Sequence, residues 1–354
     1  LEVIVPRGWF LPVTPGTKYV SVAGAIANDV HGKNHHRAGT FGCHVTQFEL
    51  LRSNGEQLLC SPTQNVELFR ATIGGLGLTG LILWAEFTLK PIAGPLIEME
   101  RIRLPSLDAF FEVSGRSDQR YEYTVAWIDC LACGESLGRG IFMRGNHKES
   151  GETGRSGLPM TPTIPFDFPT FVLNHTTVKV FNTLYYRAQW QERIKSQVHY
   201  EPFFYPLDIV NNWNRIYGKR GFMQYQCVVP HDEGHAAIRE IMRRIARSGS
   251  ASFLAVLKEF GEVPSPGILS FPRPGVTLAL DFPHHGAPTL ALFDELDELV
   301  REAGGAVYPA KDARMSAANF QAYFPQWQDF ARYVDPHFSS SFWRRVTVPQ
   351  KDNF

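Results

Sequence analysis

The residues best suited to chemistry lie in one short segment, 16–42, which combines small residues with cations and imidazoles. Small residues let backbone N–H groups approach a ligand closely, while cations and imidazoles hold negative charge or move protons. This combination suits a cofactor that carries a pyrophosphate and a redox-active ring. The alternative is a buried Gly/Ala strand with histidines on the surface. The polar cluster is His31, Lys33, Asn34, His35 and His36.

A metal site is not expected in this segment. His31, His35 and His36 have no carboxylate or cysteine partner at the spacing of metal ligands. His35 and His36 are adjacent, and in extended backbone adjacent side chains point to opposite faces, so at most one of them needs to face a site.

The N-terminal elements must present this segment. Residues 20–29 are β-branched early and contain glycine, which predicts a strand running into a glycine loop. Val45–Leu51 and Gln57–Cys60 flank Ser-Asn-Gly-Glu, which predicts a hairpin with a type I′ turn. Val66–Ile73 is expected to be a helix that enters the glycine-rich loop 74–80, and Leu81–Leu89 a strand.

The remainder of the chain predicts an antiparallel sheet covered by helices on one side, an α+β layer. Composition shifts at 145–170, which is rich in Gly, Ser, Pro and Thr and predicts a mobile loop, a lid near the substrate. One more helix is expected over Phe320–Tyr333. The expected strands are Tyr121–Ile128, Gly221–Val229 and Gly275–Phe282, and the expected helices are Glu233–Ser248 and Leu290–Ala303.

Composition narrows the class of protein. The 354 residues carry a formal net charge of zero with no basic run, which argues against a nucleic-acid partner. No window of about 18 apolar residues occurs, so no transmembrane segment is expected. The N-terminus lacks the basic region and cleavage site of a signal peptide. We expect a cytoplasmic protein or one peripheral to the membrane, without excluding the periplasm.

The cysteines do not predict a disulfide framework. Five is an odd number, which favours a reducing compartment. The single C-x-x-C, Cys130 to Cys133, has neither a second pair nor a thioredoxin-like context, so both residues are interpreted as packing thiols.

Several motifs in order along nearly the whole chain resemble the vanillyl-alcohol-oxidase-type flavoenzymes, and within them the oxidases of polyprenylphosphoryl-ribose. The resemblance implies a two-domain α+β fold, with 1–95 and 305–354 binding FAD and 96–304 binding substrate. Family members begin with roughly another hundred residues that carry a pyrophosphate loop. The N-terminal portion of the FAD domain is therefore expected to be missing here, either from this sequence alone or from the protein, and in the second case FAD affinity would be weakened. The motifs are AGAIANDVHGKNHHRAGTFG, ELFRATIGGLGLTGLI, YTVAWIDC, FYPLD, WNRIYG, GFMQYQ, LSFPRPG, LDFP and YPAKDAR.

The resemblance assigns roles residue by residue. Catalysis falls to Lys311, at the flavin–substrate junction, and to His31, near the flavin ring. Noncovalent FAD is expected to contact Gly16, Thr17, Gly24, Ala25, Ile26, Ala27, Asn28, His31, Gly77, Thr79, Ile82 and Tyr308. Substrate is expected to contact Lys33, Trp127, Phe204, Gln226, Lys258, Thr277, Ala279 and Lys311.

Structural alternatives stand beside these roles. Lys311 could be a surface lysine paired with Asp312, and Lys258 could lie on an amphipathic surface beside Glu259. Trp127 could be a core residue, and Gln224 with Gln226 a solvated pair on one strand face.

Three positions depart from the family pattern. Ala279 stands where mycobacterial members have a cysteine that covalent nitroaromatic inhibitors attack, Thr277 replaces an asparagine, and Phe204 replaces a tyrosine. Since hydride transfer does not need the cysteine, activity is expected to survive its absence. Thr277 and Phe204 change the hydrogen bonding of the pocket, so a different glycan or lipid is expected.

The function implied is oxidation of a secondary sugar hydroxyl by hydride transfer to FAD, with the C2 hydroxyl of a polyprenylphosphoryl-ribose as the expected target. An NADH-dependent reductase would be the partner that completes an epimerisation, in cell-wall arabinan synthesis. Two alternatives are kept: a soluble alditol or sugar-lactone oxidase of the same superfamily, and a binding module without flavin.

Overall fold

The computed structural model describes residues 1–149, 161–169, 171–250, 252–312 and 314–347. Its largest element is an eight-stranded sheet in the order β13-β10-β12-β11-β7-β8-β6-β9, in which every neighbouring pair is antiparallel. The expected large antiparallel sheet of a mixed α+β protein is therefore confirmed. The strands are β6 (Leu96–Leu104), β7 (Tyr123–Ile128), β8 (Gly140–His147), β9 (Arg193–His199), β10 (Phe222–Val229), β11 (Ala255–Phe260), β12 (Gly275–Pro283) and β13 (Ala306–Val307).

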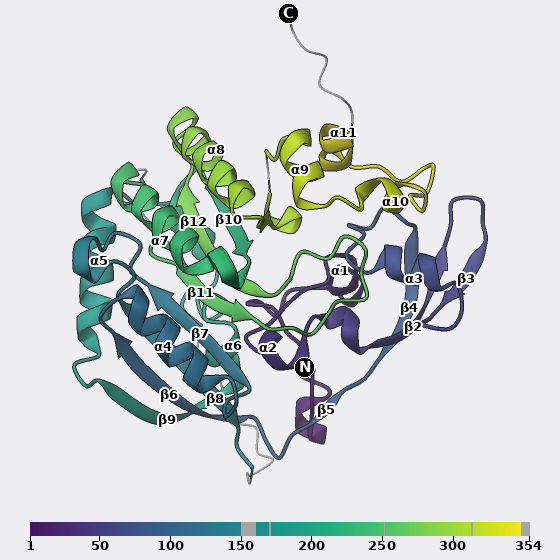
Figure 1. Ribbon diagram of the computed structural model, residues 1–354. Coiled ribbons are helices and arrows are strands. Elements are labelled where there is room, and N and C mark those ends of the chain that lie inside the picture. The colour runs from purple at the N-terminus through teal and green to yellow at the C-terminus, as the bar shows by residue number, and fades with distance from the viewer. Residues whose placement is uncertain (150–160, 170, 251, 313, 348–354) are drawn as a thin grey trace, which may run out of the picture.

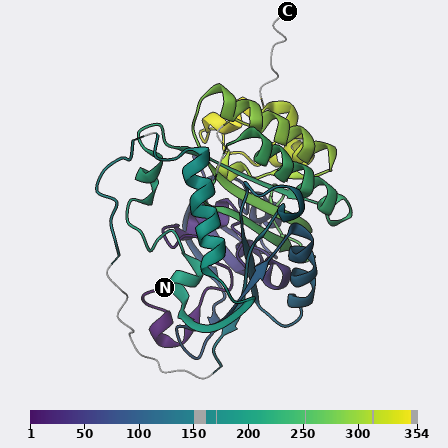
Figure 2. The same ribbon diagram turned by 90° about the vertical axis from the view of Figure 1, so that its left-hand side faces the viewer.

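Helices cover both faces of this sheet, which corrects the expectation of one covered side. Ile238 of α7 shares a buried cluster with Ala126 of β7, whereas Tyr186 of α5 packs with Trp127, the next residue of the same strand. Because side chains alternate along a strand, these two contacts lie on opposite faces. Figure 2 shows α5, in teal, in front of the sheet with α4, α7 and α8 to its right. The helices are α4 (Leu107–Ser117), α5 (His175–Ala188), α6 (Tyr200–Phe204), α7 (His231–Ser248) and α8 (Ala287–Glu302).

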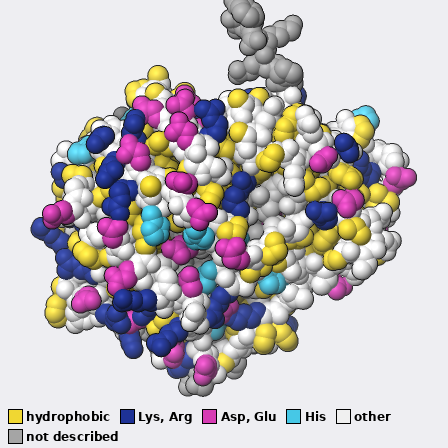
Figure 3. All heavy atoms as spheres, viewed as in Figure 1, with side chains coloured by type: hydrophobic (Ala, Val, Ile, Leu, Met, Phe, Trp, Pro, Cys, Tyr) yellow, Lys and Arg dark blue, Asp and Glu magenta, His cyan; other side chains and the backbone are white. Residues whose placement is uncertain are grey.

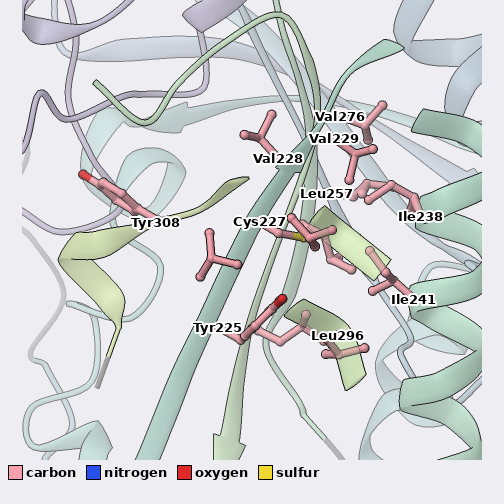
Figure 4. Packing of buried hydrophobic residues seen from close by; sticks show 14 of the residues in the cluster. Tyr225, Cys227, Val228, Val229, Ile238, Ile241, Leu257, Val276, Leu296 and Tyr308 are labelled. Atoms are coloured by element: carbon pink, nitrogen blue, oxygen red, sulfur yellow. The ribbon is translucent and has the colours of Figure 1, made fainter. Parts of the chain in front are cut away.

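The core lies between β10–β12 and the helices α7 and α8. Figure 4 shows Cys227 of β10 and Leu257 of β11 beside Ile241 of α7, with Tyr308 apart on the other side of the strand. Helix α7 begins directly after Pro230 and buries Ile238, Ile241 and Ile245 at helical spacing. All of these aliphatic side chains are fully buried, so the face of the sheet that packs on α7 and α8 contributes hydrophobic stabilisation. A functional site on this sheet would have to lie on its other face.

The N-terminal part forms smaller sheets on the right of Figure 1. Strands β3, β2 and β4 pair antiparallel in that order, and β1 pairs with β5. The elements are β1 (Trp9–Phe10), α1 (Val22–Ala27), α2 (His35–Ala38), β2 (Val45–Leu51), β3 (Gln57–Cys60), α3 (Val66–Thr72), β4 (Leu81–Phe87) and β5 (Lys90–Pro91). On the face shown in Figure 3, apolar side chains are prominent over this part, and exposed Leu81, Leu83 and Trp84 belong to β4.

The hairpin β2–β3, the helix α3 and the strand β4 confirm the expectations for 45–89. The turn between β2 and β3 is not type I′, which needs two residues with positive φ. Among residues 53–56, Gly55 alone has a positive φ, of 87°. Gly55 N–H donates to Arg52 O and Arg52 N–H donates to Glu56 O, which makes a longer loop with one left-handed glycine.

The expected strand over 20–29 is wrong. Residues Val22–Ala27 form the short helix α1, whose N-cap Ser21 accepts a hydrogen bond from Gly24 N–H at 3.0 Å. The cap decides the local structure against the β-branched pair that precedes it, since a satisfied N-cap contributes about 1 kcal/mol.

One further expectation is wrong, and another lies partly outside the described residues. Phe320–Tyr333 is two helices, α9 (Ala317–Tyr323) and α10 (Trp327–Ala331), followed by α11 (Ser341–Thr347). The chain turns at Phe324-Pro325, since a proline excludes helical backbone for the residue before it. The predicted lid, 145–170, begins with the end of β8, and residues 150–160 and 170 of it lie outside the described residues.

Five short 3₁₀ helices complete the secondary structure of the described residues: η1 (Val5–Arg7), η2 (Phe41–His44), η3 (Gly134–Ser136), η4 (Trp213–Tyr217) and η5 (Pro309–Lys311). All five cysteines are unpaired, with Cys130 buried and Cys133 exposed. Within the described part of the chain no helix is long and apolar enough to cross a bilayer. The division into a flavin and a substrate domain stays a prediction.

Candidate active site

The strand register places the expected substrate residues on one face of the large sheet. Gln226 of β10 lies opposite Ala279 of β12, and Lys258 of β11 lies opposite Thr277 of β12. Val256 of β11 pairs with both Ala279 and Trp127, which carries the same face on to β7. Since residues two apart along a strand share a face, these side chains form one surface on the side away from α7 and α8.

Two polar side chains join this surface to the N-terminal segment. The Gln226 amide nitrogen lies 2.9 Å from His31 Nε2 and donates to Thr277 Oγ1 at 3.1 Å, and Thr277 Oγ1 donates to the carbonyl of Cys227. His31 is buried among aromatic rings, with ring centroids 4.8 Å from Phe260 and 5.4 Å from Tyr308. Burial, together with the charges of Lys258 and Lys311, holds the pKa of His31 well below its ordinary value, so this imidazole is neutral.

Two lysines, Lys258 and Lys311, lie near enough to His31 for their charges to lower its pKa, and Lys33 lies near Lys258. Burial, with the nearby charges of Lys33 and Lys311, lowers the pKa of Lys258 to about 7, and burial lowers the pKa of Lys33 to about 8. Burial also lowers the pKa of Lys311, whose charge the carboxylate of Asp281 favours. Lys33 Nζ donates to the carbonyl of Phe204 at 3.0 Å. We call Lys33, Lys258 and Lys311 the lysine cluster. Like charges this close repel, so an anion between them is stabilising.

The 3₁₀ helix η5 positions Lys311 at this cluster. Tyr308 N–H donates to the carbonyl of Gln226 at 2.8 Å, which fixes the start of η5 against β10. Asp312 accepts hydrogen bonds from Arg345, at 2.7 Å, and from Met315 N–H. The alternative in which Lys311 is a surface lysine paired with Asp312 is therefore not what the structure contains.

Asp281 is a residue that sequence reasoning missed. It belongs to the same sheet face, is buried, and accepts from the Gln224 side chain at 2.9 Å through Oδ1, while its Oδ2 has no partner among the described residues. Burial raises its pKa and the charge of Lys311 lowers it. Its position in the LDFP motif was quoted, but nothing in the sequence indicates that its side chain faces Lys311.

The two glycine-rich segments also meet. Gly74 N–H donates to Ile26 O at 2.9 Å, and Leu76 N–H donates to Ala27 O at 2.8 Å. Asn28 donates from its amide to Gly24 O, and its own carbonyl accepts from the Tyr308 hydroxyl at 3.0 Å. The structure thus brings the end of α1, the loop 74–77 and the start of η5 together.

The remaining expected cofactor residues lie in different environments, some exposed and some buried. Gly16 is exposed, and Thr17 donates to Asp208 at 2.9 Å. Ala25, on the buried side of α1, belongs to a hydrophobic cluster with Phe48 and Phe69, and Ile82 of β4 packs against this cluster. Gly77 is exposed with a φ of 73°, and Thr79 is buried with its hydroxyl 2.8 Å from that of Thr72.

A buried carboxylate holds this region in place. Asp29 accepts from Ser265 Oγ and Ser270 Oγ, each at 2.5 Å, and from Gly42 N–H at 2.8 Å. It is fully buried in left-handed backbone with a φ of 41°. Burial raises its pKa, and the two serine hydroxyls lower it. Asp29 therefore ties the residues flanking His31 to a loop more than two hundred residues away, another link the sequence analysis missed.

Phe204 and Trp127 contribute differently from the cluster. The ring of Phe204 is buried among Phe10, Tyr123 and Phe203, and only its carbonyl reaches toward the site, through Lys33. Trp127 is buried on the sheet face in a small cluster with Ile141 and Tyr186, and its Nε1–H donates to Phe253 O at 2.9 Å.

His35 and His36 lie on α2 and face different surroundings. His35 is buried 4.4 Å from the ring of Phe260, and burial with the charge of Lys258 lowers its pKa to about 3. His36 lines a separate hollow of about 580 Å³ together with Asp118 and Glu259. The expectation for these two residues assumed extended backbone, whereas they lie on the helix α2, and it is His35 whose pKa the charge of Lys258 lowers.

The residues present fit a flavin. His31 Nδ1 and both ring nitrogens of His35 are buried with no partner among the described residues, and a stranded polar atom costs about 1–3 kcal/mol. An aromatic, polar-edged group held against them would satisfy these atoms. A flavin gains negative charge when it accepts a hydride, and the lysine cluster would stabilise that charge.

Comparison with known proteins supports the same class. The chain is 39% identical over 363 residues to decaprenylphosphoryl-β-D-ribose oxidase of Mycolicibacterium smegmatis, covering 98% of this chain and 78% of that protein. It is 34% identical over 365 residues to an uncharacterized protein in the mprA 5′ region of Streptomyces coelicolor, covering 98% of both. Residues of the Δ(24)-sterol reductase of Mus musculus match 32% of the chain at 30% identity. No family model matches the chain.

The chain therefore belongs to the vanillyl-alcohol-oxidase-type family of FAD-linked oxidoreductases that act on CH–OH groups. Within that family, one relative of named activity that the chain matches over 98% of the chain's own length is decaprenylphosphoryl-β-D-ribose oxidase.

One prediction tests which face of the sheet is open. Ala279 is partly exposed, whereas Cys227 on the neighbouring strand is fully buried on the opposite face. Ala279→Cys should therefore create a thiol that reacts with a nitroaromatic or maleimide reagent, as read by mass spectrometry of the β12 peptide. Cys227 and Cys130 should stay unlabelled in the same sample. Labelling of Cys227 with no label at position 279 would reverse the assignment of the faces.

Proposed function

We propose that this protein binds FAD noncovalently and oxidises a secondary hydroxyl of a sugar, the C2 hydroxyl of a polyprenylphosphoryl-ribose. The observation that carries the proposal is the lysine cluster beside the His31–Gln226 pair, on a sheet face that meets the glycine segments. Identity of 39% to decaprenylphosphoryl-β-D-ribose oxidase supports the substrate class. An NADH-dependent reductase acting on the keto product would complete an epimerisation.

In this mechanism the chain orients the substrate and handles charge. FAD, when bound, supplies the hydride acceptor. Lys311 Nζ contacts the reacting hydroxyl. The proton that this hydroxyl loses would pass through Lys311 to Asp281, whose charge favours the protonated lysine and whose Oδ2 has no partner among the described residues. Lys33 and Lys258 hold the phosphate of the substrate. Neutral His31 is fixed by Gln226, so that it orients the ring without adding charge.

The residues expected to contact the cofactor are those around the ends of the glycine segments. The Tyr308 hydroxyl donates to the carbonyl of Asn28, and the carbonyls of Ile26 and Ala27 accept from N–H groups of the loop 74–77. In such a site the backbone lies close to the cofactor, and rigid support keeps it at the reacting distance.

The proposal predicts a pH dependence of binding. An anion favours the charged form of a lysine, so binding takes up a proton once the pH exceeds the pKa of Lys258, about 7, and then that of Lys33, about 8. The Kd of a short-chain prenylphosphoryl-ribose should be lowest below pH 7 and rise with pH. The rise should approach about tenfold per unit for each lysine that must be protonated.

Calorimetry from pH 6 to 9 measures this dependence. Lys258→Met should weaken binding and remove the step that begins near pH 7, whereas Lys18→Met, which removes a lysine paired with Glu201, should change neither. A Kd that stays level across this range, or one that falls as the pH rises, contradicts the role of the lysine cluster.

The substrate class is tested by anaerobic bleaching of the flavin absorbance. We expect prenylphosphoryl-ribose to bleach the purified protein, and free alditols and sugar lactones to leave it oxidised. Bleaching by alditols or lactones alone would favour the soluble sugar oxidase. A protein without flavin absorbance, which also fails to take up added FAD, would be a binding module.

A further inference from the structure

Exposed apolar side chains gather in one part of the molecule, around α5. Six of the sixteen large apolar residues that are exposed in the described chain fall between 166 and 190. Leu184 and Trp190 are 64% and 76% exposed. We call these six residues the α5 patch: Phe166, Phe171, Val180, Phe181, Leu184 and Trp190.

Helix α5 carries apolar residues on both of its sides. Its inner side buries Val178, Asn182 and Tyr186, at the spacing of one helical turn. Its outer side exposes Val180 and Leu184, which are again four residues apart. A helix at a water-facing surface ordinarily presents polar residues outward, so the outer side of α5 is built to contact something other than water.

The α5 patch is one layer of side chains from the proposed substrate wall. The ring of Tyr185, on α5, lies 4.6 Å from the ring of Trp127. Phe181 lies 6.0 Å from Phe253, whose carbonyl accepts the Trp127 Nε1–H. Figure 2 shows α5 on the surface that faces the viewer, with segments of 161–220 beside it. A molecule that covers the α5 patch therefore lies close to Trp127, at the edge of the sheet face that carries the expected substrate residues.

Helix α5 itself carries basic charge and no acidic charge. Its residues His175–Ala188 include Lys179 and Arg187 and neither Asp nor Glu. Lys179 and Arg187 are exposed on α5, and neither has an ion pair among the described residues. Aromatic and aliphatic side chains mixed with Lys and Arg on a helix that lies flat are typical of an interfacial helix on anionic lipid.

We propose that the α5 patch docks this protein on the surface of an anionic lipid bilayer, with α5 lying in the interface. This docking deepens the proposed function. It rests on that function because it assumes that the substrate carries a polyprenyl chain. Docking through α5 places Trp127, an expected substrate contact, beside the membrane. The sugar could then reach the lysine cluster while its lipid chain stays in the bilayer.

Flotation with vesicles of phosphatidylcholine containing one third phosphatidylglycerol tests the proposal on the full chain. We expect the protein to float with these vesicles and to bind pure phosphatidylcholine much more weakly. Val180→Gln with Leu184→Gln keeps helix propensity and removes exposed apolar contacts, and should weaken binding about tenfold or more. The matched control is Val3→Gln with Val66→Gln, which changes two exposed valines elsewhere and should bind as the unchanged protein does.

The outcomes separate this proposal from the proposed function. Failure of the unchanged protein to float, or equal flotation of both double variants, overturns docking through the α5 patch. Self-association that Val180→Gln with Leu184→Gln abolishes, without vesicle binding, would instead make the patch a protein interface. Bleaching by a water-soluble, short-chain prenylphosphoryl-ribose should be the same in all three proteins. Loss of bleaching in the unchanged protein refutes the proposed function and leaves the flotation result standing.

Discussion

Replacing Lys311 with alanine should slow reduction of the flavin by substrate by about two to three orders of magnitude while leaving the fold and the bound flavin intact. Asp281, whose charge favours charged Lys311, also accepts a hydrogen bond from the Gln224 side chain, so the variant leaves this carboxylate hydrogen-bonded. The variant removes the positive charge where the substrate hydroxyl loses its proton and where negative charge develops. Losing one such preorganised group costs about a hundredfold to a thousandfold in rate. Stopped-flow anaerobic reduction measures the effect directly.

The matched control is Lys18→Ala, which makes the same change in charge at a lysine that is paired with Glu201 away from the cluster. Its rate of flavin reduction should equal that of the unchanged protein. Lys311→Arg should recover part of the rate, because it restores the charge with a different geometry. Reduction of Lys311→Ala at a near-normal rate would remove Lys311 from the catalytic machinery.

Asp29→Ala should destabilise the protein by about 3 kcal/mol or more and loosen the segment that carries His31. The change strands two serine hydroxyls and the Gly42 N–H, each at a cost of about 1–3 kcal/mol if no water replaces the carboxylate. It also places alanine in left-handed backbone, which costs about 1–2 kcal/mol. Denaturation with urea gives the change in the free energy of unfolding, and FAD titration gives the change in affinity.

Asp29→Asn is the informative companion variant. Asparagine tolerates left-handed backbone and keeps one acceptor oxygen, so we expect a smaller loss of stability than for alanine. Asp118→Ala changes a carboxylate on the other side of α2 and should leave FAD affinity unchanged. If Asp29→Ala unfolds at the same urea concentration as the unchanged protein, the carboxylate is not what holds these loops together.

Motif and periodicity predicted much of this arrangement, because those signals are local. The strand-like aromatic run Gly221–Val229 and the helical spacing in Glu233–Ser248 indicated β10 and α7, and the polar segment around His31 indicated a site. Val20–Asp29 was misread because β-branched residues outweighed a cap whose effect depends on one hydrogen bond, from Gly24 to Ser21. Local propensities of this kind are easily reversed.

Tertiary partners could not be predicted in the same way. Asp29 meets Ser265 and Ser270 across more than two hundred residues, and Asp281 faces Lys311 only because of the register between β10 and β12. A one-residue shift of that register would turn Asp281 into the core. The position of Phe204 illustrates the same limit, since the motif placed it at the site, whereas its ring packs in an aromatic cluster and its carbonyl binds Lys33.

The most direct test of the proposed oxidation uses prenylphosphoryl-ribose that carries deuterium at C2. Mixed anaerobically with the purified protein, this substrate should bleach the flavin more slowly than the unlabelled compound, because the C2–H bond breaks as the hydride leaves. Substrate with deuterium at C3 should bleach it at the unlabelled rate. Equal rates for all three compounds in single-turnover experiments, or no bleaching at all, would contradict oxidation at the C2 hydroxyl.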